Sequence, residues 1–289
     1  MNAGAVRPDE VSRKLAGKTV VVTGAGSSGP GIGNGRATAL LMGRHGAQVA
    51  VLDREHAAAA ETQELLAAEG GVSVVVVCDV SEPRSCAEAV AATVGRFGGI
   101  DVLVNNVGVL GPPGTAVEVD PDEWDLGMRV NVKSMMLMAK HCIPHMVEAG
   151  GGSIVNVSSI AGLQGGHPDL LYPTSKGAIV QMTRAMAAHH GAAGIRVNCI
   201  APGLVYTPMV AGGLDEAARE ARRLQSPLEV EGTAWDVAKT ALFLASDESR
   251  WITGAVLPVD GGASAARMAA VSAFASASAG TRDARNSRS

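Results

Sequence analysis

Aromatic residues make up only 3% of the 289-residue chain, which excludes a core built from large rings. The core must instead come from Ala, Val, Leu, Ile and Met, a composition that suits buried parallel strands and close helix packing. Cysteine is also scarce, and no two of the four cysteines form a C-x-x-C pair, which argues against a zinc site. We interpret Cys78, Cys86, Cys142 and Cys199 as reduced cytosolic thiols.

Concentrated charge and long apolar runs are lacking as well. The chain has 24 Lys and Arg against 28 Asp and Glu, with no basic block in its first 260 residues, so nucleic acid is not expected as a partner. No apolar run approaches the roughly 18 residues of a membrane span, and residues 1–14 lack the apolar segment of a signal peptide. These features predict a cytoplasmic protein without a membrane partner. His141 and His145 lie four residues apart, but without a cluster of carboxylates no metal site is expected.

Short β-branched runs alternate with stretches rich in Ala, Glu and Leu along most of the chain. The runs predict strands at 19–23, 48–52, 72–77, 100–104, 153–157, 196–200 and 255–259. The stretches between them predict helices at 36–45, 56–68, 85–97, 124–149, 172–190 and 234–245. Repeated β-α-β units with short connections indicate an α/β fold, in which helices cover both faces of a parallel sheet.

No change in composition interrupts residues 17–262, which we expect to form a single catalytic domain. Residues 1–16 are polar and small and predict an N-terminal arm. Residues 263–289 are rich in Ala and Ser and predict either a disordered tail or a helical segment that docks on another subunit.

A glycine-rich turn follows the first predicted strand, with the frame Gly24-x-Gly26-x-x-Gly29 followed by Gly31-Ile-Gly33. Glycines let the chain turn sharply and let its backbone approach a pyrophosphate, which then lies at the positive N-terminus of the next helix. Asp53 ends the second strand, where a carboxylate binds the ribose hydroxyls of NAD and repels the 2′-phosphate of NADP. Two alternatives stay open: Asp53 is an ordinary turn residue, or the adjacent Arg54 admits NADP.

A second constellation lies in the later half of the chain. Tyr172 and Lys176 are four residues apart at the start of a predicted helix, which places both side chains on one face. Ser159 lies thirteen residues before Tyr172, just after a predicted strand. Singly, Ser159 could be a plain turn residue, and Asn131, in the long predicted helix, a polar residue satisfied by the backbone.

With these motifs in this order, residues 17–262 resemble the short-chain dehydrogenase/reductase family. The resemblance implies a doubly wound Rossmann-type fold with about seven parallel strands, a nicotinamide cofactor, an alcohol or ketone substrate and a homotetramer. It implies a catalytic group of Asn131, Ser159, Tyr172 and Lys176. It also implies cofactor contacts from Gly24, Gly31, Ile32, Asp53, Asp79, Val80, Asn105, Gly108, Tyr172, Lys176, Pro202, Val205 and Thr207.

The chain departs from the family pattern T-G-x-x-x-G-x-G in the glycine-rich turn. Six residues, Ala25 to Pro30, separate Thr23-Gly24 from Gly31, so the turn is three residues longer. The glycines that face a pyrophosphate therefore do not follow from the pattern. Val107 also replaces the alanine of the family's Asn-Asn-Ala-Gly motif, a modest change of volume beside the adenosine site.

These residues predict an NAD-dependent alcohol dehydrogenase or carbonyl reductase. A free tyrosine has a pKa of about 10, and lowering it by about three units takes roughly 4 kcal/mol, which one ammonium near ~4 Å supplies at an effective dielectric constant of about 20. We therefore expect Lys176 to lower the pKa of Tyr172 and to bind the nicotinamide ribose, while Ser159 holds the substrate oxygen. The resemblance further suggests that Asn131 positions a water and that Thr207 holds the carboxamide. The alternatives are an NADP-dependent reductase and an NAD-binding sensor without activity.

About 25 residues connect Thr207 to the helix near Ala234, too long for a simple connector. Residues 208–230 are predicted to form a substrate lid that moves about Gly212-Gly213 and Gly232. The alternative is a rigid helical pair that only packs on the sheet.

Overall fold

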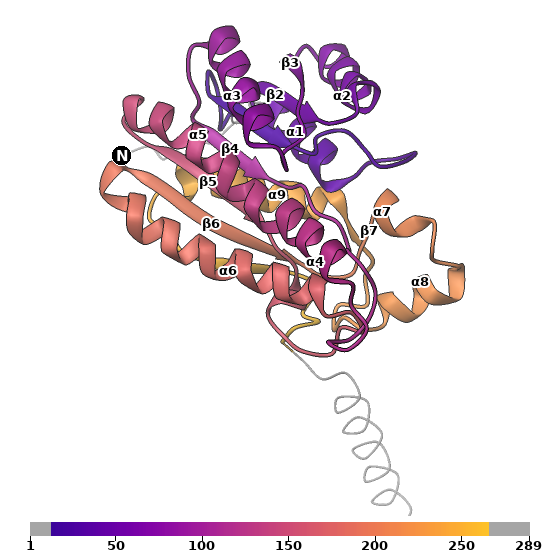
Figure 1. Cartoon of the computed structure of the whole chain (residues 1–289). Helices are drawn as coiled ribbons and strands as arrows, with labels where there is room; N and C mark the ends of the chain where they lie inside the picture. The colour runs from indigo at the N-terminus through magenta and orange to yellow at the C-terminus, as the bar shows by residue number, and fades with distance from the viewer. Residues whose placement is uncertain (1–12, 266–289) are drawn as a thin grey trace, which may run out of the picture.

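Seven parallel strands form the central sheet of the computed structural model, which describes residues 13–265. The strands follow one another across the sheet in the order β3, β2, β1, β4, β5, β6, β9 (Figure 1). Their bounds are β1 Thr19–Thr23, β2 Gln48–Asp53, β3 Val72–Val77, β4 Val102–Asn105, β5 Gly152–Val157, β6 Ile195–Pro202 and β9 Val256–Val259. The seven predicted strands and the α/β fold class are thereby confirmed.

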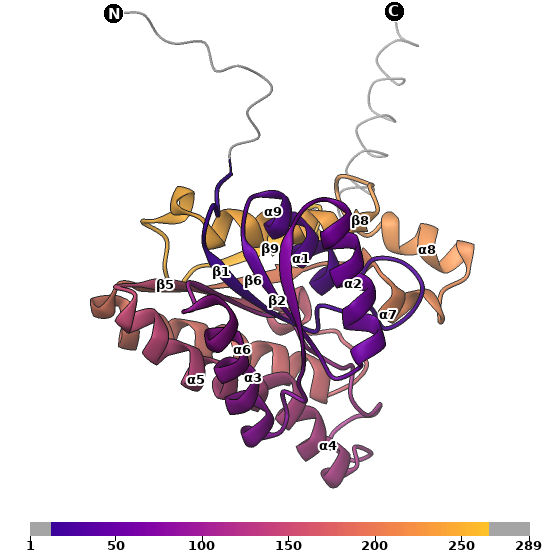
Figure 2. The same cartoon turned by 90° about the horizontal axis from the view of Figure 1, so that it is seen from above.

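Helices cover both faces of this sheet, because strands in its centre are apolar on both sides (Figure 2). One face carries α1 (Asn34–Arg44), α2 (His56–Ala68) and α9 (Ala234–Ala245), whose small and aliphatic side chains share a core with β1 and β2. The other face carries α3 (Pro83–Phe97), α5 (Ser134–Glu148) and α6 (Leu171–His190) over a second core. All five residues of β1 are buried, as their β-branched composition predicts.

The chain reverses its direction of travel across the sheet between β1 and β4. It runs outward from β1 to β2 and β3, and then crosses back to place β4 on the other side of β1. Connections leave in opposite directions at this point, so a crevice opens beyond the carboxyl ends of β1 and β4. The glycine-rich turn follows β1 and begins at this crevice.

The predicted helix 124–149 is divided in the structure. It consists of α4 (Pro121–Met128), a five-residue π-helical segment (Arg129–Lys133) and α5. At the junction the Ser134 N–H donates to the carbonyl of Arg129, and the Ser134 hydroxyl donates to the carbonyl of Val130 at 2.6 Å. The predicted stretch is thus helical nearly throughout, and the hydrophobic pattern did not report the local change in hydrogen-bond register in its middle.

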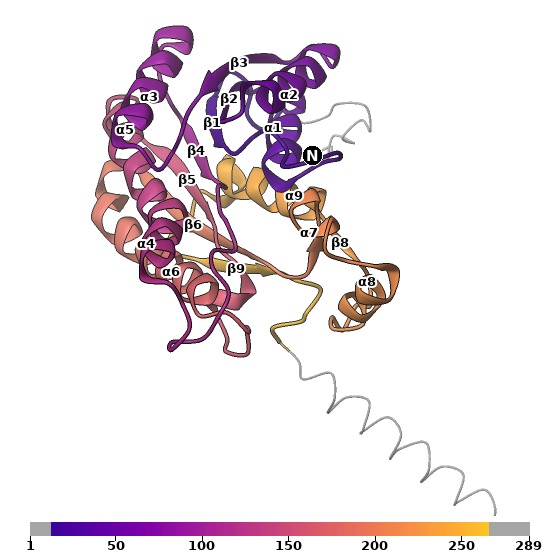
Figure 3. The same cartoon turned by 45° about the vertical axis from the view of Figure 1, so that its right-hand side comes forward.

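The predicted lid contains two short helices, α7 (Pro208–Ala211) and α8 (Glu216–Arg223), which project from one side of the sheet (Figure 3). Two strands that the sequence did not predict, β7 (Val205–Tyr206) and β8 (Gly232–Thr233), pair in parallel at its base. The β7–β8 pair thus joins the two ends of the predicted lid to each other.

The ends of the chain lie mostly outside the described residues. The predicted arm is described only from residue 13, and there Leu15 is 1% exposed and packs in the core. The predicted tail is described only to residue 265, so its two alternatives fall outside the described part. Between residues 13 and 265, none of the helices has the length and apolar character needed to cross a membrane.

Candidate active site

One large cleft, with a volume of about 1230 Å³, runs along the carboxyl ends of the strands. Its walls include the glycine-rich turn, the ends of β2 to β6, and the lid residues Met209 and Arg222. The cleft therefore lies where the reversal in strand order predicts a ligand site.

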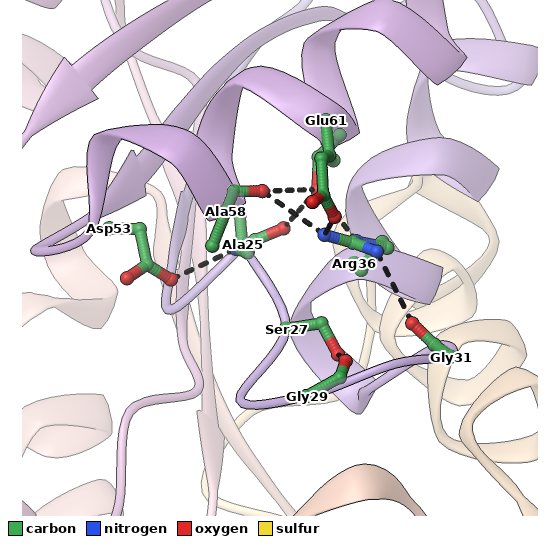
Figure 4. A network of polar contacts seen from close by, with 10 residues as sticks. Ala25, Ser27, Gly29, Gly31, Arg36, Asp53, Ala58 and Glu61 are labelled. Atoms are coloured by element: carbon green, nitrogen blue, oxygen red, sulfur yellow. Dashed lines mark hydrogen bonds and ion pairs between the residues drawn. The ribbon is translucent and has the colours of Figure 1, made fainter.

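Arg36, in the first turn of α1, donates hydrogen bonds that hold the lengthened glycine-rich turn in place (Figure 4). This side chain is 6% exposed. Its guanidinium donates to the carbonyl of Gly31 at 3.2 Å, to the carbonyl of Ala58 at 3.1 Å and to the Glu61 carboxylate at 2.8 Å. Its Nε also donates to the Thr62 hydroxyl at 2.9 Å. Sequence reasoning treated Arg36 only as the start of a helix and missed this role.

Asp53 packs closely against the first part of the glycine-rich turn and accepts hydrogen bonds from the backbone there. The Gly26 N–H donates to Asp53 Oδ2 at 2.9 Å, and the Glu55 N–H donates to Oδ1 at 3.1 Å. A Cβ on Gly26 would lie 2.7 Å from the Cβ of Ala58 and 2.8 Å from Asp53 Oδ2, so only glycine fits there. Asp53 lines the cleft with lone pairs left to accept further hydrogen bonds.

The Asn106 side chain joins the ends of β1 and β4 across the crevice. Its amide donates to the carbonyls of Thr23 and Gly24, both at 3.2 Å. The Asn106 N–H also donates to the Thr23 hydroxyl at 3.0 Å. Asn106 precedes Val107 in the chain's version of the Asn-Asn-Ala-Gly motif, and the motif alone does not reveal hydrogen bonds between distant segments.

Polar groups at the start of α1 are left open toward the cleft. Gly33 gives the helix no side-chain cap, and no acidic residue lies in its first turn. Asn34 lines the cleft, and its buried Oδ1 has no hydrogen-bond partner among the described residues. An uncapped helix N-terminus favours an anion, and a buried orphan acceptor favours a ligand with a donor. A dinucleotide, with phosphates and ribose hydroxyls, fits both.

Tyr172, Ser159 and Lys176 come together at the floor of the cleft. Ser159 and Tyr172 share a side-chain hydrogen bond, and the Ser159 hydroxyl accepts a second one from the Ala161 N–H at 3.1 Å. Lys176 is 4% exposed, and its Nζ lies 5.6 Å from the centre of the Tyr172 ring. A Cβ on Gly108 would lie 3.0 Å from this Nζ, so a larger residue there would press on the ammonium.

The charge states of this group differ from the expectation. Burial raises the pKa of Tyr172, and the Ser159 hydrogen bond lowers that pKa by less. Burial lowers the pKa of Lys176 to about 8. The Lys176 ammonium donates its hydrogen bond to the carbonyl of Val157, at 3.2 Å, rather than to the phenol oxygen. In this geometry burial, rather than Lys176, decides the pKa of Tyr172, contrary to the expectation of a lowered value.

Asn131 lies in the π-helical segment and is fully buried. Its Oδ1 accepts from the Val109 N–H at 2.8 Å, and its Nδ2 donates to the carbonyl of Val109 and the hydroxyl of Ser175, both at 2.9 Å. The side chain thus joins the loop after β4 to α6, which carries Tyr172 and Lys176.

Most of the expected cofactor residues line the cleft, and three do not. Those that line it are Gly24, Asp53, Asp79, Val80, Gly108, Tyr172, Lys176, Pro202, Val205 and Thr207. Ile32 instead packs against Ala37 of α1 and Ala234 and Ala238 of α9. Asn105 is 1% exposed and donates to Asn156 Oδ1 at 2.9 Å inside the sheet.

Gly31, the third, serves the turn by its backbone. Its φ of +109° suits only glycine, and its carbonyl accepts from Arg36. Within residues 13–265, no group of three or more His, Cys, Asp or Glu could hold a metal ion.

Comparison with known proteins identifies the family. The sequence model described as enoyl-(acyl carrier protein) reductase matches residues 29–264. A short-chain type dehydrogenase/reductase of Sinorhizobium fredii is 38% identical, over 86% of this chain and 98% of that protein. The cis-4-hydroxycyclohexanecarboxylate dehydrogenase of Sinomonas cyclohexanicum is 37% identical, over 86% of this chain and 97% of that protein.

A solved structure agrees with these sequence matches. It is that of a 7α-hydroxysteroid dehydrogenase complexed with NADH and 7-oxo glycochenodeoxycholic acid. It superposes with a TM-score of 0.81 at 30% identity, over 87% of this chain and 96% of that one. The chain therefore belongs to the short-chain dehydrogenase/reductase family and is an oxidoreductase of that type.

Proposed function

We propose that the protein transfers a hydride between a secondary alcohol, or the matching ketone, and a nicotinamide dinucleotide, with NAD as the preferred cofactor. The observation that carries the proposal is the Ser159–Tyr172 hydroxyl pair at the cleft floor, directly beside the buried Lys176. A protein that only binds a nucleotide has no need of this arrangement. The named relatives act on, or are complexed with, hydroxylated or oxo compounds, which supports the substrate class.

In the proposed reaction Ser159 and Tyr172 hold the substrate oxygen by hydrogen bonds. During oxidation the hydroxyl proton passes to the Tyr172 oxygen, and the C–H electron pair leaves carbon as hydride while the C=O bond forms. Acceptance or donation of that hydride is the chemistry that a bound nicotinamide supplies. Lys176 stabilises the tyrosine oxygen while it carries negative charge.

The charge states favour the reductive direction at neutral pH. Because burial raises the pKa of Tyr172, the phenol keeps its proton and is ready to donate it to a ketone oxygen. Lys176 is charged below its pKa of about 8. In this scheme Asn131 is a positioning residue, since its side chain contacts Val109 and Ser175 rather than the cleft.

Asp53 supports the preference for NAD, because its carboxylate lines the cleft at the end of β2. Its oxygens would accept the adenosine ribose hydroxyls and repel a 2′-phosphate. The second candidate is an NADP-dependent reductase, favoured by Arg54, which also lines the cleft. Arg54 lies 3.6 Å from the Glu55 carboxylate, so part of its charge is already balanced. A homotetramer and a cytoplasmic location stay predictions.

The experiment is a nicotinamide absorbance assay with a panel of cyclic secondary alcohols and ketones, run with NAD(H) and NADP(H) in both directions. We expect turnover of at least one pair with NAD(H), and its loss in Tyr172→Phe. Turnover that survives Tyr172→Phe would contradict the proposed mechanism. Binding of NAD without turnover of any substrate would favour the sensor, and a preference for NADP(H) would favour the second candidate.

A further inference from the structure

Three arginines lie on α8, and they differ in how their charges are balanced. Arg219 donates to both carboxylate oxygens of Glu231, at 3.0 and 2.6 Å. Arg223 donates to both oxygens of Glu220, each at 2.7 Å. The Arg222 guanidinium makes no hydrogen bond or ion pair with any residue in 13–265, although the residue is half-buried.

Arg222 is the one of these three that lines the cleft. Burial lowers its pKa, and Glu231 opposes this effect only from a distance, because both Glu231 oxygens already bind Arg219. A partly desolvated guanidinium without a partner is costly, and a carboxylate or phosphate on a ligand would remove that cost through two parallel hydrogen bonds.

Apolar side chains line the same cleft from the loop after β4, from α4, from the π-helical segment and from the lid, among them Leu110, Leu126, Val130, Met209 and Val210. The polar side chain that lines it from the lid beside Arg222 is the uncharged Gln225. The carboxylates that line the cleft are Asp53, which ends β2, and Glu55 and Asp79, which follow β2 and β3 toward the other end of the strand order. Among the described residues that line the cleft, the lid and the loop after β4 therefore contribute apolar and uncharged polar side chains to accompany Arg222, and no carboxylate.

The phosphates of a dinucleotide are the other possible source of negative charge. They belong at the glycine-rich turn, where α1 begins uncapped. In Figures 1 and 3, α7 lies between this turn and α8. Pro208, at the start of α7, lies against the turn: a Cβ on Gly29 would lie 3.7 Å from it. This arrangement places Arg222 on the substrate side of the lid.

We propose that the substrate carries a carboxylate at the end of an apolar body, and that Arg222 binds this carboxylate while Tyr172 and Ser159 act on the distant hydroxyl or ketone. This inference rests on the proposed function and adds the substrate class. Arg222 is then a specificity-determining residue rather than a catalytic one.

The test compares each keto acid with its neutral amide at saturating cofactor, using 4-oxocyclohexanecarboxylate and the longer 4-(4-oxocyclohexyl)butanoate. We expect at least one acid to exceed its amide in kcat/KM by about tenfold to a hundredfold, the usual value of a hydrogen-bonded charge pair. Arg222→Gln should remove this preference mainly through KM, and Arg222→Lys should restore part of it. Arg223→Gln is the matched control, because it removes a neighbouring charge that lies outside the cleft, and it should keep the preference.

Titration calorimetry measures the affinity of the acids for the wild type and for Arg222→Gln, and so tests the same site without turnover. The proposal is overturned if the wild type treats acid and amide alike, or if Arg222→Gln keeps the preference. It is also overturned if Arg222→Gln weakens binding of NAD, measured by fluorescence titration, and leaves the acid preference unchanged, since Arg222 then binds a cofactor phosphate. Reduction of the amides alone would leave the proposed function standing and reject only this inference.

Discussion

Lys176 donates a hydrogen bond from its ammonium to the main-chain oxygen of Val157 at 3.2 Å, with 4% of the residue exposed. One neutral acceptor does not replace the water that a buried ammonium loses, which is why burial lowers the pKa of Lys176 to about 8. The site therefore holds a charge that destabilises the fold.

Lys176→Met should raise the free energy of unfolding at neutral pH while abolishing turnover. The pKa falls from 10.5 to about 8 on folding, so charged Lys176 opposes folding by up to about 3 kcal/mol below that pH. Between about pH 8 and 10.5 the unfolded chain binds more protons at this residue, so the wild type gains stability as pH rises through this window.

Urea unfolding of both proteins across that pH range measures the difference. Lys176→Met should lack the part of the pH dependence that Lys176 contributes. A variant that is less stable than wild type at neutral pH would show that the lysine contributes more by packing than its charge costs.

Tyr172→Phe should lower kcat by about a hundredfold to ten-thousandfold, the usual contribution of a positioned proton donor, and leave NAD binding intact. The ring keeps its place beside His167, whose ring centre lies 5.2 Å away, so the fold should not change. Steady-state kinetics and fluorescence titration with NAD measure the two effects. Turnover within about threefold of wild type would reject Tyr172 as the acid.

Ketone reduction should be independent of pH below about 8 and decline above it, because Lys176 loses its charge there while Tyr172, whose pKa burial raises, stays protonated. Alcohol oxidation should instead keep rising into the alkaline range, since Tyr172 must lose its proton. Rates at saturating NADH and NAD give both profiles. Lys176→Arg, which stays charged, should abolish the decline in reduction. An unchanged decline in that variant would assign it to another group.

How far the sequence predicts this site depends on the range of the interactions. Tyr172 and Lys176 share a helix, so their spacing alone places them together. Arg36 could not be assigned, because its partners Gly31, Ala58 and Glu61 belong to two segments that meet only in the folded sheet. The strands were predictable because a short apolar run of β-branched residues by itself indicates a strand that is buried on both faces.

The π-helical segment and the pKa of Tyr172 were not predictable for a related reason. Asn131 bonds to Val109 across the fold, and helical periodicity does not record such a bond. The pKa of Tyr172 depends on how deeply the phenol is buried, whereas the expectation from the motif considered only the positive charges of Lys176 and of a nicotinamide. Both depend on packing between elements that are distant in sequence.

Asp53→Ala should weaken NAD binding and improve the relative use of NADP by about fivefold, the factor that follows from roughly 1 kcal/mol of repulsion between two charges near 4 Å in water. The variant also loses the acceptor for the Gly26 N–H, so a small loss of stability is expected. The ratio of kcat/KM for the two cofactors measures the effect. Arg54→Ala is the control and should reduce the use of NADP. A wild type that already prefers NADP would reject the role assigned to Asp53.

Residues 208–230 should exchange their amide hydrogens faster than the sheet, and slow down when NAD and a substrate analogue bind. Neither α7 nor α8 has a buried residue, so little apolar surface holds them in place. The two ends of the lid are fixed, by the β7–β8 pair and by the Leu228 N–H, which donates to the carbonyl of Gly261 at 3.2 Å.

Between these fixed ends lies Gly212, where a Cβ would meet nothing within 4 Å, so no neighbouring group packs against the chain at this point. Closure would bring α7 onto the glycine-rich turn, which Pro208 already approaches. Excluding water there strengthens the hydrogen bonds to the reacting oxygen. Gly212→Pro, which restricts the backbone at this residue, should reduce the ligand-induced protection, whereas Gly95→Ala on the surface of α3 should not. Equally strong protection of 208–230 with and without ligands would favour the rigid helical pair over a moving lid.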